Sequence, residues 1–157
     1  MLSESFKPFF DWCGTTWLGT IVRDTVWAFP LIETFHLLAL AVLLGTVLIV
    51  NLRVFGLGRR YYASAGHIAH DLEPWMLASV GVLIASGIPM FLSEPEKCYE
   101  SYSFPIKIML IVIGIAYQLT VQRRWIVRDD RKAKVAACLS ILVWTTVGLA
   151  GKGIPYV

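Results

Sequence analysis

The segment 27–60 constrains the fold more than any other part of this chain. About twenty mostly apolar residues follow Pro30, and three arginines end the run. At about 1.5 Å per residue, such a run crosses the roughly 30 Å of hydrocarbon in a bilayer as one α-helix. Proline suits the first turn of a helix, because its missing N–H would have no partner there. We therefore expect a membrane-spanning helix over residues 30–52.

The composition indicates an integral membrane protein. Of the 157 residues, 57% are hydrophobic and 16% charged, and the mean hydropathy is +0.65. Soluble domains are about 25% charged. Further apolar runs predict spans at 74–92, 105–122 and 134–150. The expected fold is therefore all-α, an integral membrane four-helix bundle that forms one domain over residues 1–157.

Residues 1–26 have a different pattern. Apolar and charged side chains alternate at helical spacing on both sides of Gly14, which is typical of amphipathic helices that lie in a membrane interface. We expect an N-terminal amphipathic arm, which either contacts lipid or packs on the protein's own surface. Because it lacks a basic region followed by a continuous apolar run, we do not expect a cleaved signal peptide.

The second predicted span begins at Pro74. The segment 61–73 before it, which contains His67 and His70, is then expected to be an interfacial loop. This loop lies at the opposite end of the first span from His36.

The basic residues predict the orientation. Nine of the fourteen follow the first and third predicted spans, and such charges concentrate on the cytoplasmic side of a membrane. The nine are Arg53, Arg59, Arg60, Arg123, Arg124, Arg128, Arg131, Lys132 and Lys134; the other five are Lys7, Arg23, Lys97, Lys107 and Lys152. We expect a multi-pass protein of the bacterial inner membrane with both termini in the periplasm. The basic residues are not interleaved with exposed aromatics, so no nucleic-acid partner is expected.

The three cysteines have no CxxC or CxxCH spacing, which argues against structural zinc, iron–sulfur clusters and c-type haem. In the predicted topology Cys13 and Cys98 both face the periplasm, where they either pair or remain free.

Two residues of the first span can carry chemistry. On a helical wheel Glu33 and His36 share a sector with Leu40, Leu43, Val47 and Asn51, so we expect this stripe to face the other helices. Ionisable groups in a membrane segment are costly unless they meet a partner or a ligand.

The predicted spans place two further residues at the same depth, Met90 late in the second and Lys107 early in the third. We therefore expect Glu33, His36, Met90 and Lys107 to form a cofactor-binding level near the periplasmic face.

Three ligands fit this level. A haem b would take His36 as one axial ligand, with Met90 as the second or with one open position. A quinone or other small ligand would bond to His36, with Glu33 as proton acceptor. A metal such as copper would bind His36 and Met90, since imidazole and thioether donors suit it.

A structural interpretation stands beside these. In it Glu33 pairs with Lys107, and His36 bonds to a serine or backbone group of the second span. The protein would then be a non-catalytic structural or assembly subunit of a membrane complex. The sequence contains no nucleophile elbow, P-loop, HExxH or GxGxxG motif, so independent catalytic activity is not expected. Transport is disfavoured, because there is no inverted repeat.

The first span also resembles a known family. The residues that carry the resemblance are Trp27-Ala-Phe-Pro30, Glu33, His36-Leu-Leu-Ala-Leu-Ala41 and Asn51-Leu-Arg53, together with Phe104-Pro-Ile-Lys107. They resemble a family of small, uncharacterised four-helix bacterial inner-membrane proteins whose first helix carries Glu-x-x-His and ends in Asp-Leu-Arg. Asn51 stands where that family typically has Asp. The resemblance implies a membrane bundle and brings no activity with it.

The expected partners follow from this topology. They are the lipid bilayer and other membrane or periplasmic subunits, or further copies of this chain. The leading functional hypothesis is a small, redox-linked membrane subunit that holds haem b or a quinone at the level of His36.

Overall fold

The computed structural model describes residues 4–57, 64–126 and 131–153, and within these ranges the chain is helical without a strand. Four helical segments in these ranges are long and apolar enough to cross a membrane. They are α3 (Ala28–Val54), α4 (Ala65–Ser93), the continuous segment of α6 (Ser103–Tyr117), η2 (Gln118–Gln122) and α7 (Arg123–Ile126), and α8 (Arg131–Gly153).

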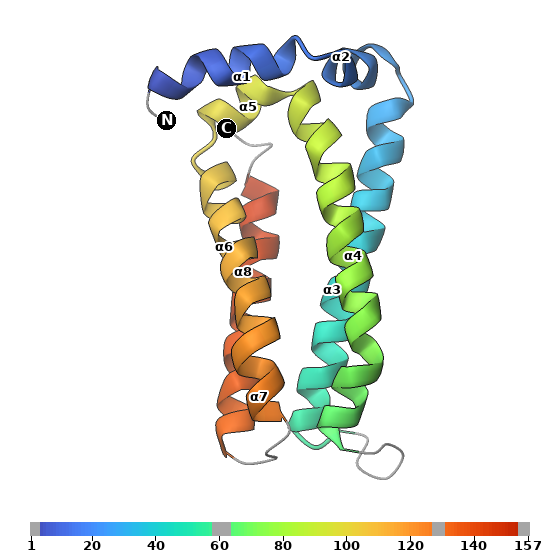
Figure 1. Ribbon diagram of the computed structural model, residues 1–157, viewed down its shortest axis with the longest axis vertical. Helices are drawn as coiled ribbons and strands as arrows, with labels where there is room; N and C mark the ends of the chain where they lie inside the picture. The colour runs from blue at the N-terminus through green and yellow to red at the C-terminus, as the bar shows by residue number, and fades with distance from the viewer. Residues whose placement is uncertain (1–3, 58–63, 127–130, 154–157) are drawn as a thin grey trace.

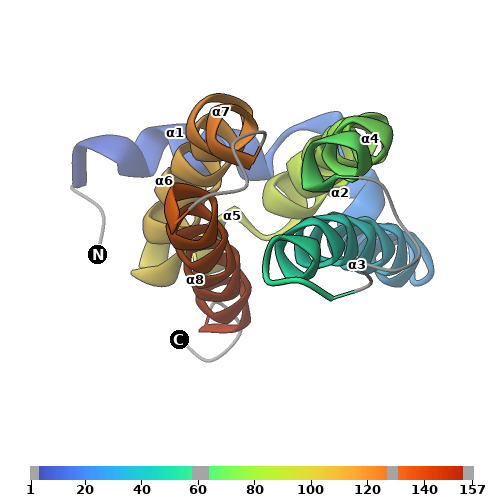
Figure 2. The same ribbon diagram turned by 90° about the horizontal axis from the view of Figure 1, so that it is seen from below.

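The long helices lie side by side in two pairs (Figures 1 and 2). One pair is α3 with α4 and the other is α6 with α8, while α3 also contacts α8. Three short helices lie across one end of the pairs: α1 (Lys7–Gly14), α2 (Trp17–Asp24) and α5 (Pro95–Glu100). We call this the capped end.

The two short N-terminal helices agree with the predicted arm. The turn η1 (Glu4–Phe6) leads into α1, which ends at Gly14 as expected. Helix α1 buries Phe10 and exposes Trp12, so it is amphipathic. The Thr16 side chain caps α2 by accepting a hydrogen bond from the Gly19 N–H at 3.3 Å. The arm therefore packs on the protein through one face and leaves aromatic side chains exposed on the other.

Aromatic side chains hold the capped end together. The Phe10 ring meets Phe91 of α4 edge-on, with centroids 5.5 Å apart, and Tyr99 of α5 at 5.4 Å. Phe91 also stacks on Phe104 of α6 at 5.4 Å. Four helices thus share one aromatic cluster, in which edge-on and stacked pairs are the favoured geometries.

The predicted start of the second long helix is wrong. Helix α4 begins at Ala65, because Ser64 caps it by accepting a hydrogen bond from the His67 N–H at 3.3 Å. Pro74 lies inside the helix, where its ring removes one backbone hydrogen bond without ending the helix. His67 and His70 are therefore helical residues of the first turns and not loop residues.

Other boundaries differ less. The loop expected between the second and third spans contains α5, the third long segment extends to Ile126, and α8 begins at Arg131. Arg59, Arg60 and Arg128, used above for orientation, lie outside the described residues.

The predicted inward stripe of the first long helix is confirmed at three positions. Leu43, Val47 and Asn51 are all buried. Leu43 and Val47 pack with Met76 and Trp144 in one core cluster. A second cluster, nearer the end opposite the cap, contains Val50, Val54, Ala65, Ile126, Ala133 and Ala137.

Candidate functional site

His36 lies at the contact between α3 and α4, nearer the capped end. Its Nδ1 is 2.8 Å from the Ser86 hydroxyl, and its Cε1 approaches the backbone of Gly87 closely enough that a Cβ there would lie 3.6 Å away. The predicted hydrogen bond between His36 and a serine of the second long helix is confirmed.

The Ser86 hydroxyl determines which nitrogen of His36 carries the proton. Ser86 Oγ lies 2.6 Å from the Val82 carbonyl oxygen, to which it donates its single proton. His36 must then donate from Nδ1–H to Ser86 Oγ. In the neutral imidazole this leaves Nε2 with a free lone pair. Nε2 has no hydrogen-bond partner among the described residues, so it is available to a ligand.

Glu33 does not join this site. Its side chain is exposed, and no ion pair in the described part of the chain connects it with Lys107. The expected Glu33–Lys107 pair is therefore absent, a difference with a simple geometric cause. The buried positions of α3 recur every three to four residues, and this series continues from His36 to the half-buried Ile32. Glu33 falls beside the stripe.

Lys107 and Met90 do lie near the capped end, as expected, and both are half-buried. The charge of Lys107 acts on His36 and on the Cys98 thiol, so these three groups lie within electrostatic range of one another. Met90 is one turn beyond Ser86 on α4, and its carbonyl accepts the Ser93 hydroxyl at 2.8 Å.

The two cysteines of the capped end, Cys13 and Cys98, are buried, unpaired thiols. The pKa of the Cys98 thiol is raised to about 11, mainly by burial and also by the nearby Glu94 carboxylate, while Lys107 and Lys97 partly offset these effects. Burial also raises the pKa of Cys13. Both thiols therefore stay protonated at neutral pH.

We predict slow alkylation of Cys98 in the folded protein. With the pKa moved from 9.0 to about 11, about a thousandth of the thiol is ionised at pH 8, against about a tenth normally. Iodoacetamide should thus modify Cys98 about 100-fold more slowly in mild detergent than in SDS. The rate should rise about tenfold per pH unit up to pH 11. Mass spectrometry measures the extent of alkylation over time. Equal rates of alkylation in the two detergents would contradict the buried environment of Cys98.

A second polar site lies nearer the opposite end, and the sequence did not predict it. It is a network of four hydrogen-bonded side chains, which we call the Asn51 network. Gln122 Nε2 donates to Asn51 Oδ1 at 2.7 Å, Asn51 Nδ2 donates to Ser140 Oγ at 3.2 Å, and Ser140 Oγ donates to Gln118 Oε1 at 3.2 Å. Asn51, Gln122 and Ser140 are 0% exposed. The Asn51 network joins α3, η2 and α8, so it fixes how the two helix pairs meet.

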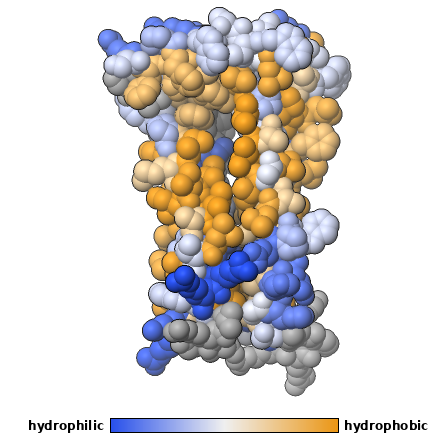
Figure 3. All heavy atoms as spheres, viewed as in Figure 1, coloured by the Kyte–Doolittle hydropathy of each residue, from blue (hydrophilic) through white to orange (hydrophobic). Residues whose placement is uncertain are grey.

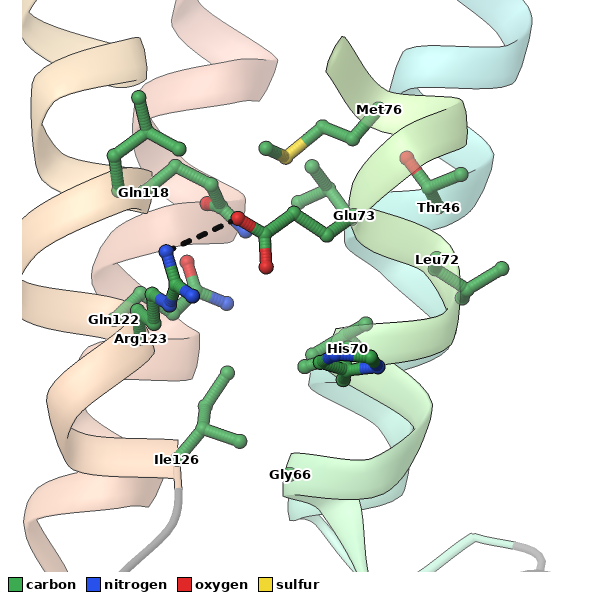
Figure 4. A pocket seen from close by; sticks show the side chains of 14 residues that line it. Thr46, Gly66, His70, Leu72, Glu73, Met76, Gln118, Gln122, Arg123 and Ile126 are labelled. Carbon is green, nitrogen blue, oxygen red and sulfur yellow. Dashed lines mark ion pairs between the residues drawn. The ribbon is translucent and has the colours of Figure 1, made fainter. Parts of the chain in front are cut away.

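An ion pair adjoins this network. Arg123 Nη1 of α7 lies 3.2 Å from Glu73 Oε1 of α4, and the two charges connect the helix pairs across a cavity (Figure 4). One signal could have revealed the site: two glutamines four residues apart in an apolar helix, at the level of Asn51. Without the register between helices, their partners could not be named.

The fold and these two polar sites define an all-helical protein with four helical segments suited to crossing a membrane. The chain belongs to DUF6644, a family of unknown function, which it matches over residues 9–157. No curated protein and no solved structure gives a significant match to the chain.

Proposed function

We propose that this protein is a small, redox-linked subunit of the bacterial inner membrane that binds a quinol beside His36. In this proposal the two helix pairs form a four-span bundle with the capped end and both termini in the periplasm. The charge distribution supports that orientation: Arg53, Arg123, Arg124, Arg131, Lys132 and Lys134 all belong to helix ends opposite the cap.

The observation that carries the proposal is the hydrogen-bond relay from His36 through Ser86 to the Val82 carbonyl. A relay of this kind holds the ring in one orientation and one tautomer, as partners of ligand-binding histidines do. The free Nε2 can accept a hydrogen bond from a quinol hydroxyl. On deprotonation the quinol O–H proton moves to Nε2, and the positive charge of Lys107 stabilises the resulting quinolate.

The shape of the protein gives such a ligand an approach. A furrow runs between the two helix pairs toward the capped end, and its rims are apolar with hydrophilic atoms deeper inside (Figure 3). Apolar rims suit the ring and tail of a lipid-soluble molecule, and a few polar groups then fix its orientation.

The geometry supports a quinol better than a haem ligated by His36 and Met90. The imidazole packs directly on the backbone of α4 at Gly87, and Met90 belongs to the same helix. A haem would need space for its porphyrin ring between His36 and Met90, and the close contact of α3 with α4 leaves no such space.

We predict that His36→Ala weakens binding of a short-tailed ubiquinol analogue about fivefold, since one well-placed hydrogen bond is worth about 1 kcal/mol. Ser86→Ala should weaken binding a few-fold, because the tautomer is no longer fixed. Quenching of tryptophan fluorescence in detergent measures both. His67→Ala, at an exposed helix start near the other end, should bind like wild type.

Two outcomes would overturn the quinol proposal. One is a wild-type protein that does not bind the analogue. The other is a Soret band in the purified protein that His36→Ala removes, which would make the ligand a haem.

The His36–Ser86 bond also favours the second candidate, a structural or assembly subunit in which this bond connects α3 and α4. In that case His36→Ala lowers the melting temperature or complex assembly and no quinol binds. The absence of the Glu33–Lys107 pair weakens this candidate, because that pair was the second contact between helices that the structural interpretation expected.

A further inference from the structure

A cavity of about 190 Å³ lies between the two helix pairs, toward the end opposite the cap. Its walls come from α3 and α4 on one side and from η2 and α7 on the other (Figure 4). Most of the lining is apolar and includes Val47, Val50, Leu72, Met76, Leu119 and Ile126. This space suits a single ring or the first part of an aliphatic tail.

One side of the cavity is polar. The Glu73–Arg123 pair spans it, and Gln118 and Gln122 lie on the same wall as Arg123 (Figure 4). The two charges cancel, so the lining does not select a ligand with a net charge such as phosphate. A neutral head group keeps the ion pair intact, whereas an anion would compete with Glu73 for Arg123.

Several polar atoms here lack a partner. The guanidinium of Arg123 has five N–H groups and makes one ion pair within the described ranges. The Gln118 amide accepts from Ser140 through Oε1, while no acceptor for its Nε2 occurs in the described part of the chain. Of these atoms only Gln122 Oε1 is buried without a hydrogen-bond partner, whereas Gln118 is half-buried and the Arg123 side chain is 65% exposed. The spare N–H groups of Arg123 and Gln118 are therefore the donors that a ligand in the cavity can use.

The backbone supports the same conclusion. Gln118–Gln122 forms a π-helix within an otherwise α-helical segment, and it contributes both glutamines to the cavity. Single π-helical turns occur frequently at functional sites, because they widen the helix at a cost in hydrogen bonding. The distortion lies at the cavity wall, and through Gln122 it also contributes to the buried Asn51 network.

We infer that this cavity is a binding site for a carbonyl-bearing head group on an apolar tail. The carbonyl oxygen accepts hydrogen bonds from the spare N–H groups of Arg123 and Gln118, and the tail lies along the apolar wall. A quinone ring and the ester region of a phospholipid both present this chemistry. The inference is independent of the quinol site at His36, which lies nearer the other end.

Photolabelling of the wild-type protein tests the site. The probe is an azidoquinone with a ten-carbon tail, and tandem mass spectrometry locates the label residue by residue. We expect label on Leu72, Met76 or Leu119, suppressed by excess unlabelled quinone or by excess phosphatidylethanolamine. Suppression by the phospholipid alone identifies a lipid ester as the occupant, and suppression by the quinone identifies a quinone. Label found only near His36 and Ser86, or cavity label that neither competitor suppresses, would overturn the inference.

Variants separate the cavity from the His36 level. Arg123→Gln should reduce labelling of the cavity at least fivefold, and Arg124→Gln, its exposed neighbour outside the lining, should leave it unchanged. His36→Ala should also leave cavity labelling unchanged, so failure of the quinol proposal and failure of this inference give different label maps. Equal labelling of Arg123→Gln and wild type would also count against the site.

Discussion

Gly19→Ala is expected to separate α2 from α4. A Cβ at Gly19 would overlap the Leu92 carbonyl oxygen and lie 2.8 Å from the Leu92 carbonyl carbon. Both are backbone atoms of a long helix and cannot turn aside. The arm must therefore move, at a cost of about 1–3 kcal/mol, the usual range for overpacking.

Trypsin cleavage after Arg23 reports this movement. In the folded protein Arg23 belongs to α2, and its guanidinium donates to the Gly14 carbonyl at 3.0 Å, which holds the arm closed. We expect faster cleavage and a lower melting temperature in Gly19→Ala. Gly45→Ala and Gly81→Ala are matched controls, because a Cβ at either position meets nothing within 4 Å. If trypsin cleaves Gly19→Ala at the same rate as wild type, the contact between α2 and α4 is looser than described.

Asn51→Leu is expected to destabilise the joint between the helix pairs by about 1–3 kcal/mol. Leucine has nearly the same shape, but it removes an acceptor from Gln122 and a donor from Ser140. Gln122 Oε1 already lacks a partner, so the whole Gln122 amide would become unsatisfied in a buried site. Thermal unfolding in detergent measures the loss.

Thr46→Val provides the control for Asn51→Leu. Thr46 is also buried on α3, but its hydroxyl bonds only to the Leu43 carbonyl of its own helix at 2.8 Å. We expect a change of less than about 0.5 kcal/mol, because no group on another helix loses its partner. If both variants melt like wild type, the Asn51 network does not hold the pairs together.

The periodicity of α3 could be read from the sequence because a helix repeats every 3.6 residues whatever surrounds it. The burial of Leu43, Val47 and Asn51 followed from that repeat alone. The same repeat placed Glu33 at the margin of the stripe. Whether a residue at the margin is buried or exposed depends on how closely the neighbouring helix packs there, and in this structure Glu33 is exposed.

The start of α4 shows a different limit. Proline is a strong local signal for a helix start, but it also occurs inside long helices whose neighbours compensate for the lost hydrogen bond. Helix α4 begins instead at Ala65, capped by Ser64, and Pro74 lies inside it. The local signal at Pro74 was therefore not enough to place the helix start, and only the tertiary structure did so.

The sequence by itself determined that the chain is helical, that four segments are apolar enough for a membrane, and that an amphipathic arm precedes them. These properties depend on composition and on local spacing. Only the tertiary structure decided which polar groups meet: His36 with Ser86, Glu73 with Arg123, and Asn51 with Gln122. Such contacts depend on the rotation and depth of each helix against its neighbours, and these are set by packing between segments distant in the chain.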